Sequence, residues 1–86
     1  MYQHTTVIVS ACFFDQRNQT WRTSNRLSEE SYASLEEAMT SGQNQVGEKR
    51  SVIVRPSYNE EDEKGRYYRE WRSFNGSPFE ECRWDL

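Results

Sequence analysis

The residue types that carry most enzyme chemistry are scarce in this chain of 86 residues. His4 is the only histidine, so neither a Ser-His-Asp triad nor a Cys-His pair can be assembled within one chain. Cys12 and Cys82 are far apart in sequence and belong to no CxxC pair. Together with His4 they fall short of the four ligands of a structural zinc site. We therefore expect no catalytic residue, no metal and no cofactor, and we interpret both cysteines as reduced thiols.

Carboxylates are plentiful, but their spacing does not favour acid-base chemistry. The pairs Glu36-Glu37 and Glu80-Glu81 are adjacent in sequence, whereas glycosidase carboxylates face one another across a cleft. Counted from Asn59, the acidic run at residues 59–65 has Lys64 where a calcium-binding EF-hand loop requires glycine at its sixth position, so the pattern is not matched. We interpret the pairs as helix-capping and solubilising groups and the run as a solvated hairpin loop.

Residues 64–72 (KGRYYREWR) combine arginine with aromatic rings. The segment partly resembles the RNA-recognition-motif signature, in which a Lys/Arg-Gly start precedes alternating rings that stack on bases. Arg66, Tyr67 and Arg69 stand where that signature has an aromatic, a small and an aliphatic residue. That fold also begins with strand, helix and strand, which is not the order expected here, so the chain is not assigned to the family.

Two interpretations of this segment stay open. In the first, Tyr67 and Trp71 point into the core while their neighbours pair across strands, and the segment has no function beyond the fold. In the second, a single helix covers only one face of the sheet and leaves the other face for a partner. The residues expected to bind a partner on that face are Arg22, Arg55, Tyr68, Arg72, Phe14 and Ile53, a mixture of apolar, Tyr and Arg side chains that is typical of interface hot spots.

The elements that must position these residues begin with a hairpin. Residues 5–14 (TTVIVSACFF) are rich in β-branched and aromatic residues and apolar on both faces, which predicts a central strand. Alternation places Ile8, Cys12 and Phe14 on the face away from the helix. Residues 15–18 supply turn chemistry, and residues 19–24 alternate enough to return as a second strand.

A helix is predicted to follow. Ser34 and Glu37 form a capping box, so the helix should begin at Leu35. Gly47 stands where a left-handed C-terminal cap would end it, and Gly42 should weaken its second half.

The C-terminal half completes the predicted sheet. Residues 50–58 read as a third strand in which Pro56 favours an edge or a strand end, and residues 66–74 read as a fourth strand. From Ser77 onward, an N-cap residue followed by Pro predicts a short helix, with a fifth strand as the alternative. The sequence thus predicts an α+β fold, an antiparallel four-stranded sheet in the order ββαββ with one main helix on one face and a short C-terminal helix or strand.

Composition indicates one folded domain spanning residues 1–86, because a chain of this length has room for a single hydrophobic core. Mean hydropathy is −1.10, but the net charge is only −3 and aromatics reach 14%, enough for aromatic packing to supplement a small aliphatic core. The acidic balance disfavours a partner bound chiefly through phosphates. The N-terminus carries no basic segment, and no apolar run is long enough to cross a membrane, so we expect a cytoplasmic protein with no membrane contact.

These observations favour a non-enzymatic protein that acts by stoichiometric contact with a protein partner, an inhibitor of an enzyme or of a defence complex. In size and charge alone the chain resembles small acidic phage or mobile-element proteins, such as anti-CRISPR proteins, and small immunity proteins. A second copy of this chain is the other protein partner considered. The alternative function is a single-stranded nucleic-acid-binding module that uses the aromatic and arginine sheet face.

Overall fold

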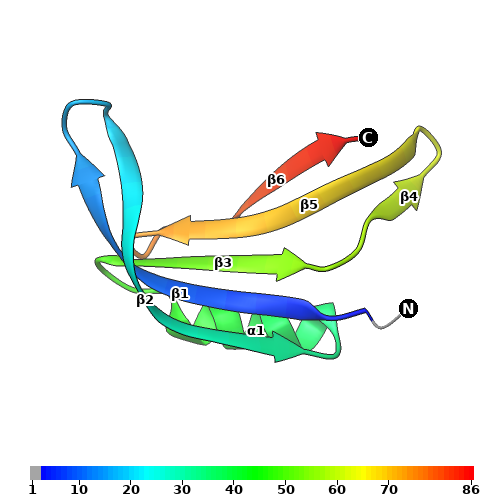
Figure 1. Ribbon diagram of the computed structural model, residues 1–86, viewed down its shortest axis with the longest axis horizontal. Coiled ribbons are helices and arrows are strands. Elements are labelled where there is room, and N and C mark those ends of the chain that lie inside the picture. Colours follow the sequence, from blue (N-terminus) through cyan, green and yellow to red (C-terminus); the bar gives the residue numbers. More distant parts are fainter. Residues whose placement is uncertain (1–2) are drawn as a thin grey trace.

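The computed structural model describes residues 3–86 and shows an antiparallel sheet with one helix against one face (Figure 1). Met1 and Tyr2, the first residues of the N-terminus that carries no basic segment, lie outside the described residues. In chain order the elements are β1 (Thr5–Asp15), β2 (Thr20–Tyr32), α1 (Leu35–Gln45), β3 (Arg50–Pro56), β4 (Glu60–Asp62), β5 (Gly65–Phe74) and β6 (Glu80–Asp85).

The predicted α+β class and antiparallel sheet are confirmed, but the four-stranded ββαββ order is wrong in detail. The described sheet has six strands, in the order β2-β1-β3-β5-β4, with β6 also pairing with β5. Trp71 of β5 lies opposite Val54 of β3 on one side and Glu81 of β6 on the other, whereas Tyr67 lies between Glu60 of β4 and β6. Strand β4 therefore continues the row of β3, and β6 closes the far edge of β5.

The core lies between α1 and the middle of the sheet. As expected for a central strand, β1 pairs with β2 on one side and β3 on the other. Val7, Val9, Val52 and Val54 are fully or almost fully buried and pack with Ala38 of the helix. Partly buried apolar side chains complete this layer: Tyr32, Leu35, Met39, Val46, Trp71 and Phe79. Large rings thus supplement a small valine core.

Helix α1 begins where the capping residues predict. The Ser34 hydroxyl accepts a hydrogen bond from the Glu37 amide at 3.2 Å, which satisfies one of the free amides at the helix start. The predicted left-handed cap at Gly47 is wrong: the helix ends at Gln45, its C-cap Val46 is extended, and positive φ occurs at Lys49 instead. In residues 3–86, no helix is long and apolar enough to cross a membrane.

Gly42 has a packing role that helix propensity alone does not reveal. It is buried against the sheet, and an added Cβ would lie 2.9 Å from Cγ2 of Val54 and 3.2 Å from Cζ of Phe79. The absence of a side chain therefore lets α1 approach β3 closely. The glycine that was expected to weaken the helix is what fits the helix onto the sheet.

The second strand is longer than the sequence predicts and bends the hairpin. β2 runs to Tyr32 rather than ending at Ser24, and its register with β1 shifts between Val9 and Ser10 and again between Ser10 and Cys12. Such bulges increase twist and bend a strand. In Figure 1 the tip of the β1–β2 hairpin turns away from α1 and rises into the upper part of the view, where β5 and β6 also lie. The face opposite the helix is therefore concave.

Of the two structures predicted for the C-terminal segment, the strand is confirmed as β6 and the short helix is wrong. Asn75 and Gly76, which both have positive φ, turn the chain after β5. Ser77 does not cap a helix: its hydroxyl accepts from the Phe74 amide at 3.2 Å, and its carbonyl accepts from the Ser73 hydroxyl at 2.6 Å. These bonds close the connection between β5 and β6, and pairing with β5 then outweighs the local helix-start pattern.

Candidate protein-binding face

A cavity of about 480 Å³ opens on the concave face, where the bent hairpin meets the centre of the sheet. We call it the concave cavity, and its lining residues are Phe13, Trp21, Arg22, Thr23, Ile53, Arg72 and Phe74. The first four come from the hairpin and the other three from β3 and β5. The bulges described above are what bring these distant segments to one place. The result is a pocket with apolar walls and two guanidinium groups.

A second cavity of about 470 Å³ adjoins the first and shares Trp21 and Phe74 with it; the other lining residues are Ser77, Pro78, Phe79 and Glu80. Phe14 packs edge-to-face on Trp21, with ring centroids 5.4 Å apart and an interplanar angle of 65°. This contact fixes the indole that forms part of both cavities. Several large apolar side chains here stay accessible, with Phe13 48% exposed and Phe14 42% exposed.

The floor beside the cavity is organised by one buried carboxylate, Glu70, whose side chain is only 6% exposed. It accepts hydrogen bonds from Arg55 Nε at 2.7 Å, from the Tyr68 hydroxyl at 2.9 Å and from an Arg72 terminal nitrogen at 2.9 Å. The same Tyr68 hydroxyl is 2.9 Å from the Pro56 carbonyl oxygen. Two arginines thus share one carboxylate, which leaves one positive charge in excess.

This network shifts two titrations. Burial alone would raise the pKa of Glu70, but the hydrogen bonds from Arg72, Arg55 and Tyr68 outweigh it and hold that pKa below its ordinary value. Burial, together with the bond to the negatively charged Glu70, raises the pKa of Tyr68 to about 12. Near neutral pH the cluster therefore holds an ionised glutamate and a neutral phenol.

Trp84 of β6 covers the outer side of this cluster. Its ring stacks on Tyr68, with centroids 5.7 Å apart and an interplanar angle of 29°, and the Arg72 guanidinium lies 5.4 Å from the Trp84 ring centroid. Trp84 itself remains 43% exposed. The ring of Tyr68 is thus already engaged within the chain, whereas one side of Trp84 faces solvent.

The opposite side of β5 carries a different set of arginine contacts. The Arg69 guanidinium lies 4.7 Å from the Trp71 ring and pairs with Glu60 and Glu81, and Arg83 lies 3.7 Å from the Tyr67 ring. These interactions link β4, β5 and β6 to one another. Tyr67, Arg69 and Trp71 of the arginine-aromatic segment therefore have a structural role in these contacts.

Two apolar residues expected on the face away from the helix are buried. Ile8 and Cys12 are only 6% and 5% exposed, so neither contributes to an accessible surface. Cys12 is a buried free thiol, and Cys82 is a half-buried free thiol.

The six residues predicted to bind a partner divide into three groups. Arg22, Ile53 and Arg72 line the concave cavity together. Arg55 and Tyr68 lie beside it, bonded to Glu70. Phe14 does not line the cavity but packs edge-to-face on Trp21, which does.

Phe13, Trp21 and Phe74 line the cavity but were not among the predicted contacts. Regular alternation along β1 places Phe13 on the helix side together with Val7 and Val9. The register shifts break that alternation, so Phe13 reaches the cavity instead. The sequence feature that could have identified these lining residues is composition, because large aromatic residues flank the turn of the first hairpin.

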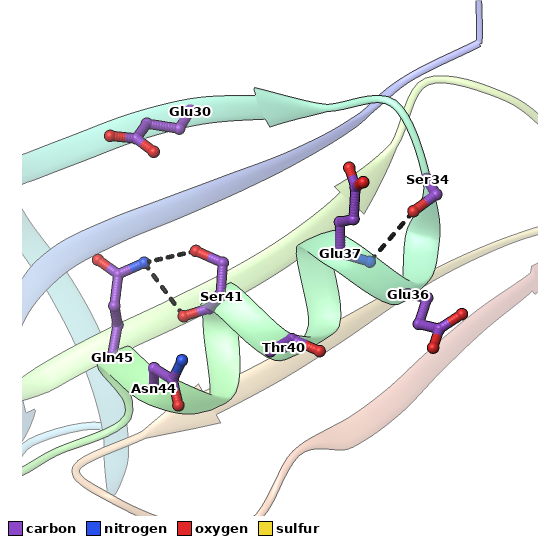
Figure 2. A pocket seen from close by; sticks show the side chains of 8 residues that line it. All are labelled: Glu30, Ser34, Glu36, Glu37, Thr40, Ser41, Asn44 and Gln45. Carbon is purple, nitrogen blue, oxygen red and sulfur yellow. Dashed lines mark hydrogen bonds between the residues drawn. The ribbon is translucent and has the colours of Figure 1, made fainter.

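Another hollow, about 830 Å³, lies on the helix side between β2 and α1 (Figure 2). It is lined by polar side chains: Glu30, Ser34, Glu36, Glu37, Thr40, Ser41, Asn44 and Gln45. Several of these groups already bond one another, as Gln45 does with Ser41, and Tyr32 links Glu30 to Ser41. This hollow has no aromatic wall, and its groups serve helix capping and strand-helix contact.

The remaining reactive groups do not form a site. His4 is held at the end of β3, where its amide donates to the Ser57 hydroxyl and its carbonyl accepts from the Ser57 amide. Within residues 3–86, no three His, Cys, Asp or Glu side chains are grouped so as to hold a metal ion. Comparisons of this chain with protein-family models, with curated proteins and with solved structures found no match.

Proposed function

We propose that this protein is a non-enzymatic binding protein that acts by stoichiometric contact between its concave face and a protein partner, as an inhibitor of an enzyme or of a defence complex. The supporting observation is the concave cavity, in which accessible aromatic rings surround two arginines. Trp, Tyr and Arg in a desolvated pocket are the usual anchors of protein interfaces. The proposed setting is the cytoplasm, where the thiols of Cys12 and Cys82 stay reduced.

The alternative, a single-stranded nucleic-acid-binding module, has weaker support. Stacking on bases needs rings with free faces and a groove that is positive along its length. Tyr68, the ring proposed for that role, is stacked on Trp84 and bonded through its hydroxyl. Glu80 lines the adjoining cavity and would repel a phosphate backbone. Only the exposed side of Trp84 favours this function.

The test uses capture by the immobilised full chain from an extract of the native host, with two matched variants. Phe13→Ser removes an accessible ring from the cavity, and Leu27→Ser removes a similarly accessible apolar side chain that does not line it. A partner bound through the cavity should be retained by the wild type and by Leu27→Ser. Phe13→Ser should weaken its binding by about 2 kcal/mol, roughly thirtyfold.

Equal capture by Phe13→Ser and the wild type would contradict the proposed binding face. Sedimentation of the wild type alone tests the second copy as occupant: a dimer that dissociates in Phe13→Ser, but not in Leu27→Ser, would replace the heterologous partner. Because no catalytic role is proposed for His4, His4→Ala should leave capture unchanged. Any turnover by the purified chain that disappears in His4→Ala would overturn the non-enzymatic proposal.

A further inference from the structure

The concave cavity combines apolar walls with positively charged groups. Phe13, Trp21, Ile53 and Phe74 provide apolar walls around about 480 Å³, a volume at the lower end of the range for ligand pockets. A space of this size accepts one large apolar side chain. The adjoining cavity, which shares Trp21 and Phe74, provides room for the chain on either side of it.

The charged groups of the cavity are both cationic. Arg22 and Arg72 line it, and no carboxylate is among its lining residues, although the whole chain has a net charge of −3. Arg22 has a side chain that is 58% exposed and pairs with Asp15 at 3.4 Å, a contact that solvent screens. This guanidinium is free to turn toward an incoming anion.

Arg72 carries an unused donor. One of its terminal nitrogens bonds Glu70, but its Nε is buried and has no hydrogen-bond acceptor among the described residues. Because the Nε atom itself is shielded from solvent, an arriving acceptor meets the accessible part of the Arg72 side chain, which is 35% exposed. A carboxylate suits a guanidinium better than a neutral acceptor does, because the hydrogen bond is then charge-assisted.

We propose that the concave cavity recognises an acidic segment of the partner protein in which an aromatic or branched aliphatic side chain stands next to a carboxylate. The apolar side chain enters between Phe13, Trp21 and Phe74, and the carboxylate pairs with Arg72 and Arg22. This inference rests on the proposed function and specifies the partner's chemistry. A protein segment fits better than nucleic acid, because it can present a single anion here and an uncharged residue beside Glu80.

The experiment selects a displayed library of short random peptides on the folded full chain. Selected sequences should be enriched in Asp or Glu beside Phe, Trp, Leu or Ile. One selected peptide is then synthesised, and its binding is compared among the wild type, Arg72→Gln, Arg22→Gln and Arg66→Gln. Arg66 is an exposed arginine on the same strand as Arg72 but outside the cavity, so Arg66→Gln controls for the loss of a charge.

Arg72→Gln should lower the peptide's affinity about tenfold or more, while Arg66→Gln should leave it unchanged. Arg22→Gln should also weaken binding, and it leaves the Glu70 cluster intact if Arg72→Gln affects folding. Binding should move the indole N–H resonance of Trp21 in a nuclear magnetic resonance titration and leave that of Trp71, which packs on the core beneath the helix, in place.

Selection of basic peptides, of no peptide at all, or of peptides that bind all four proteins equally would overturn this inference. The proposed function is tested separately, because a captured partner that depends on Phe13 can lack such an acidic segment. Tight binding of oligo(dT) that falls steeply with salt and is lost in Arg72→Gln would replace both proposals with single-stranded nucleic-acid binding.

Discussion

At the scale of single residues, the carboxylate of Glu70 holds the floor of the concave face. It is the shared acceptor for Arg55, Tyr68 and Arg72, and its side chain is nearly buried. All three donors were predicted to contact a partner directly. Their positions depend on a residue that the partner itself need not touch, so substitutions at Glu70 test the organisation of the face.

The Glu70→Gln substitution should destabilise the fold by about 1–2 kcal/mol near neutral pH. The cost stays below that of a fully buried ion pair because the Arg55 side chain is 46% exposed. The folded-state pKa of Glu70 lies below its ordinary value of 4.5, so the unfolded chain takes up the proton first. This contribution is therefore present above pH 4.5 and is lost as pH falls through the folded pKa.

Urea unfolding as a function of pH measures this effect. The difference in unfolding free energy between the wild type and Glu70→Gln should shrink as the solution is acidified below pH 4.5. A difference that stays constant down to strongly acidic pH would mean that Glu70 is not held ionised by the network.

Tyr68 gives the complementary prediction at alkaline pH. Its pKa is raised from 10.0 to about 12, so between these values the folded chain keeps a proton that the unfolded chain releases. Stability from Tyr68 is therefore complete below pH 10 and is lost as pH rises toward 12. Tyr68→Phe should remove the phenol that titrates near 12 from the ultraviolet titration curve. An unchanged curve above pH 11 would place that late titration on another residue.

At the scale of elements, the close packing of α1 on β3 depends on Gly42. Gly42→Ala gains about 1 kcal/mol of helix propensity, but its Cβ would meet the stiff, buried side chain of Val54 at 2.9 Å. Overpacking of this kind costs about 1–3 kcal/mol, so we expect a net loss of stability. Gly47→Ala is the control, because its Cβ would meet only Arg50, at 3.9 Å. The midpoints of thermal unfolding of the two variants measure this loss. A higher midpoint for Gly42→Ala than for the wild type would show that the helix lies farther from the sheet.

The capping bond at Ser34 gives a second prediction for α1. Ser34→Ala leaves the Glu37 amide without its acceptor and should cost about 1 kcal/mol of folding free energy. Thr40→Ala, an exposed change within the same helix, should not lower stability. Peptide or partner binding at the concave face should survive both changes. A denaturation midpoint that is unaffected by Ser34→Ala would mean that this cap contributes nothing.

The sequence predicted the elements for which the local residue pattern and the tertiary contacts favour the same secondary structure. The central strand β1, the start of α1 and the strand β5 all follow from alternation, capping or β propensity. Strand β6 does not, because Ser77-Pro78 is a helix-start pattern and only pairing with β5 selects the strand. The second half of β2 is a polar, exposed edge strand, so no apolar alternation marks it.

The candidate site was predictable only in its composition. Arg22, Ile53 and Arg72 were expected on one face and do line one cavity. Phe13 and Trp21 were missed because their place depends on two register shifts between β1 and β2, and a shift in register changes the face on which each later side chain lies. Nothing in the local sequence marks where such bulges occur.

At the scale of the whole molecule, the two faces of the sheet have separate tasks. One face packs on α1 through the valine core, and the other is bent into a concavity by the hairpin and by β5 and β6 (Figure 1). Interface energies usually concentrate in a few anchors of this kind rather than over a whole surface. The central claim is therefore that a protein partner occupies the concave face and not the helix side.

Site-specific photo-crosslinking in the native host tests this claim most directly. Phe13→p-benzoylphenylalanine places a reactive ring at the concave cavity, and Thr40→p-benzoylphenylalanine places the same group on the helix side, in the hollow of Figure 2. Both positions are exposed, so neither change should disturb the core. We predict a covalent adduct with a single partner protein from position 13 and none from position 40. Crosslinking from position 40 alone, or from neither position, would contradict a protein-binding role for the concave face.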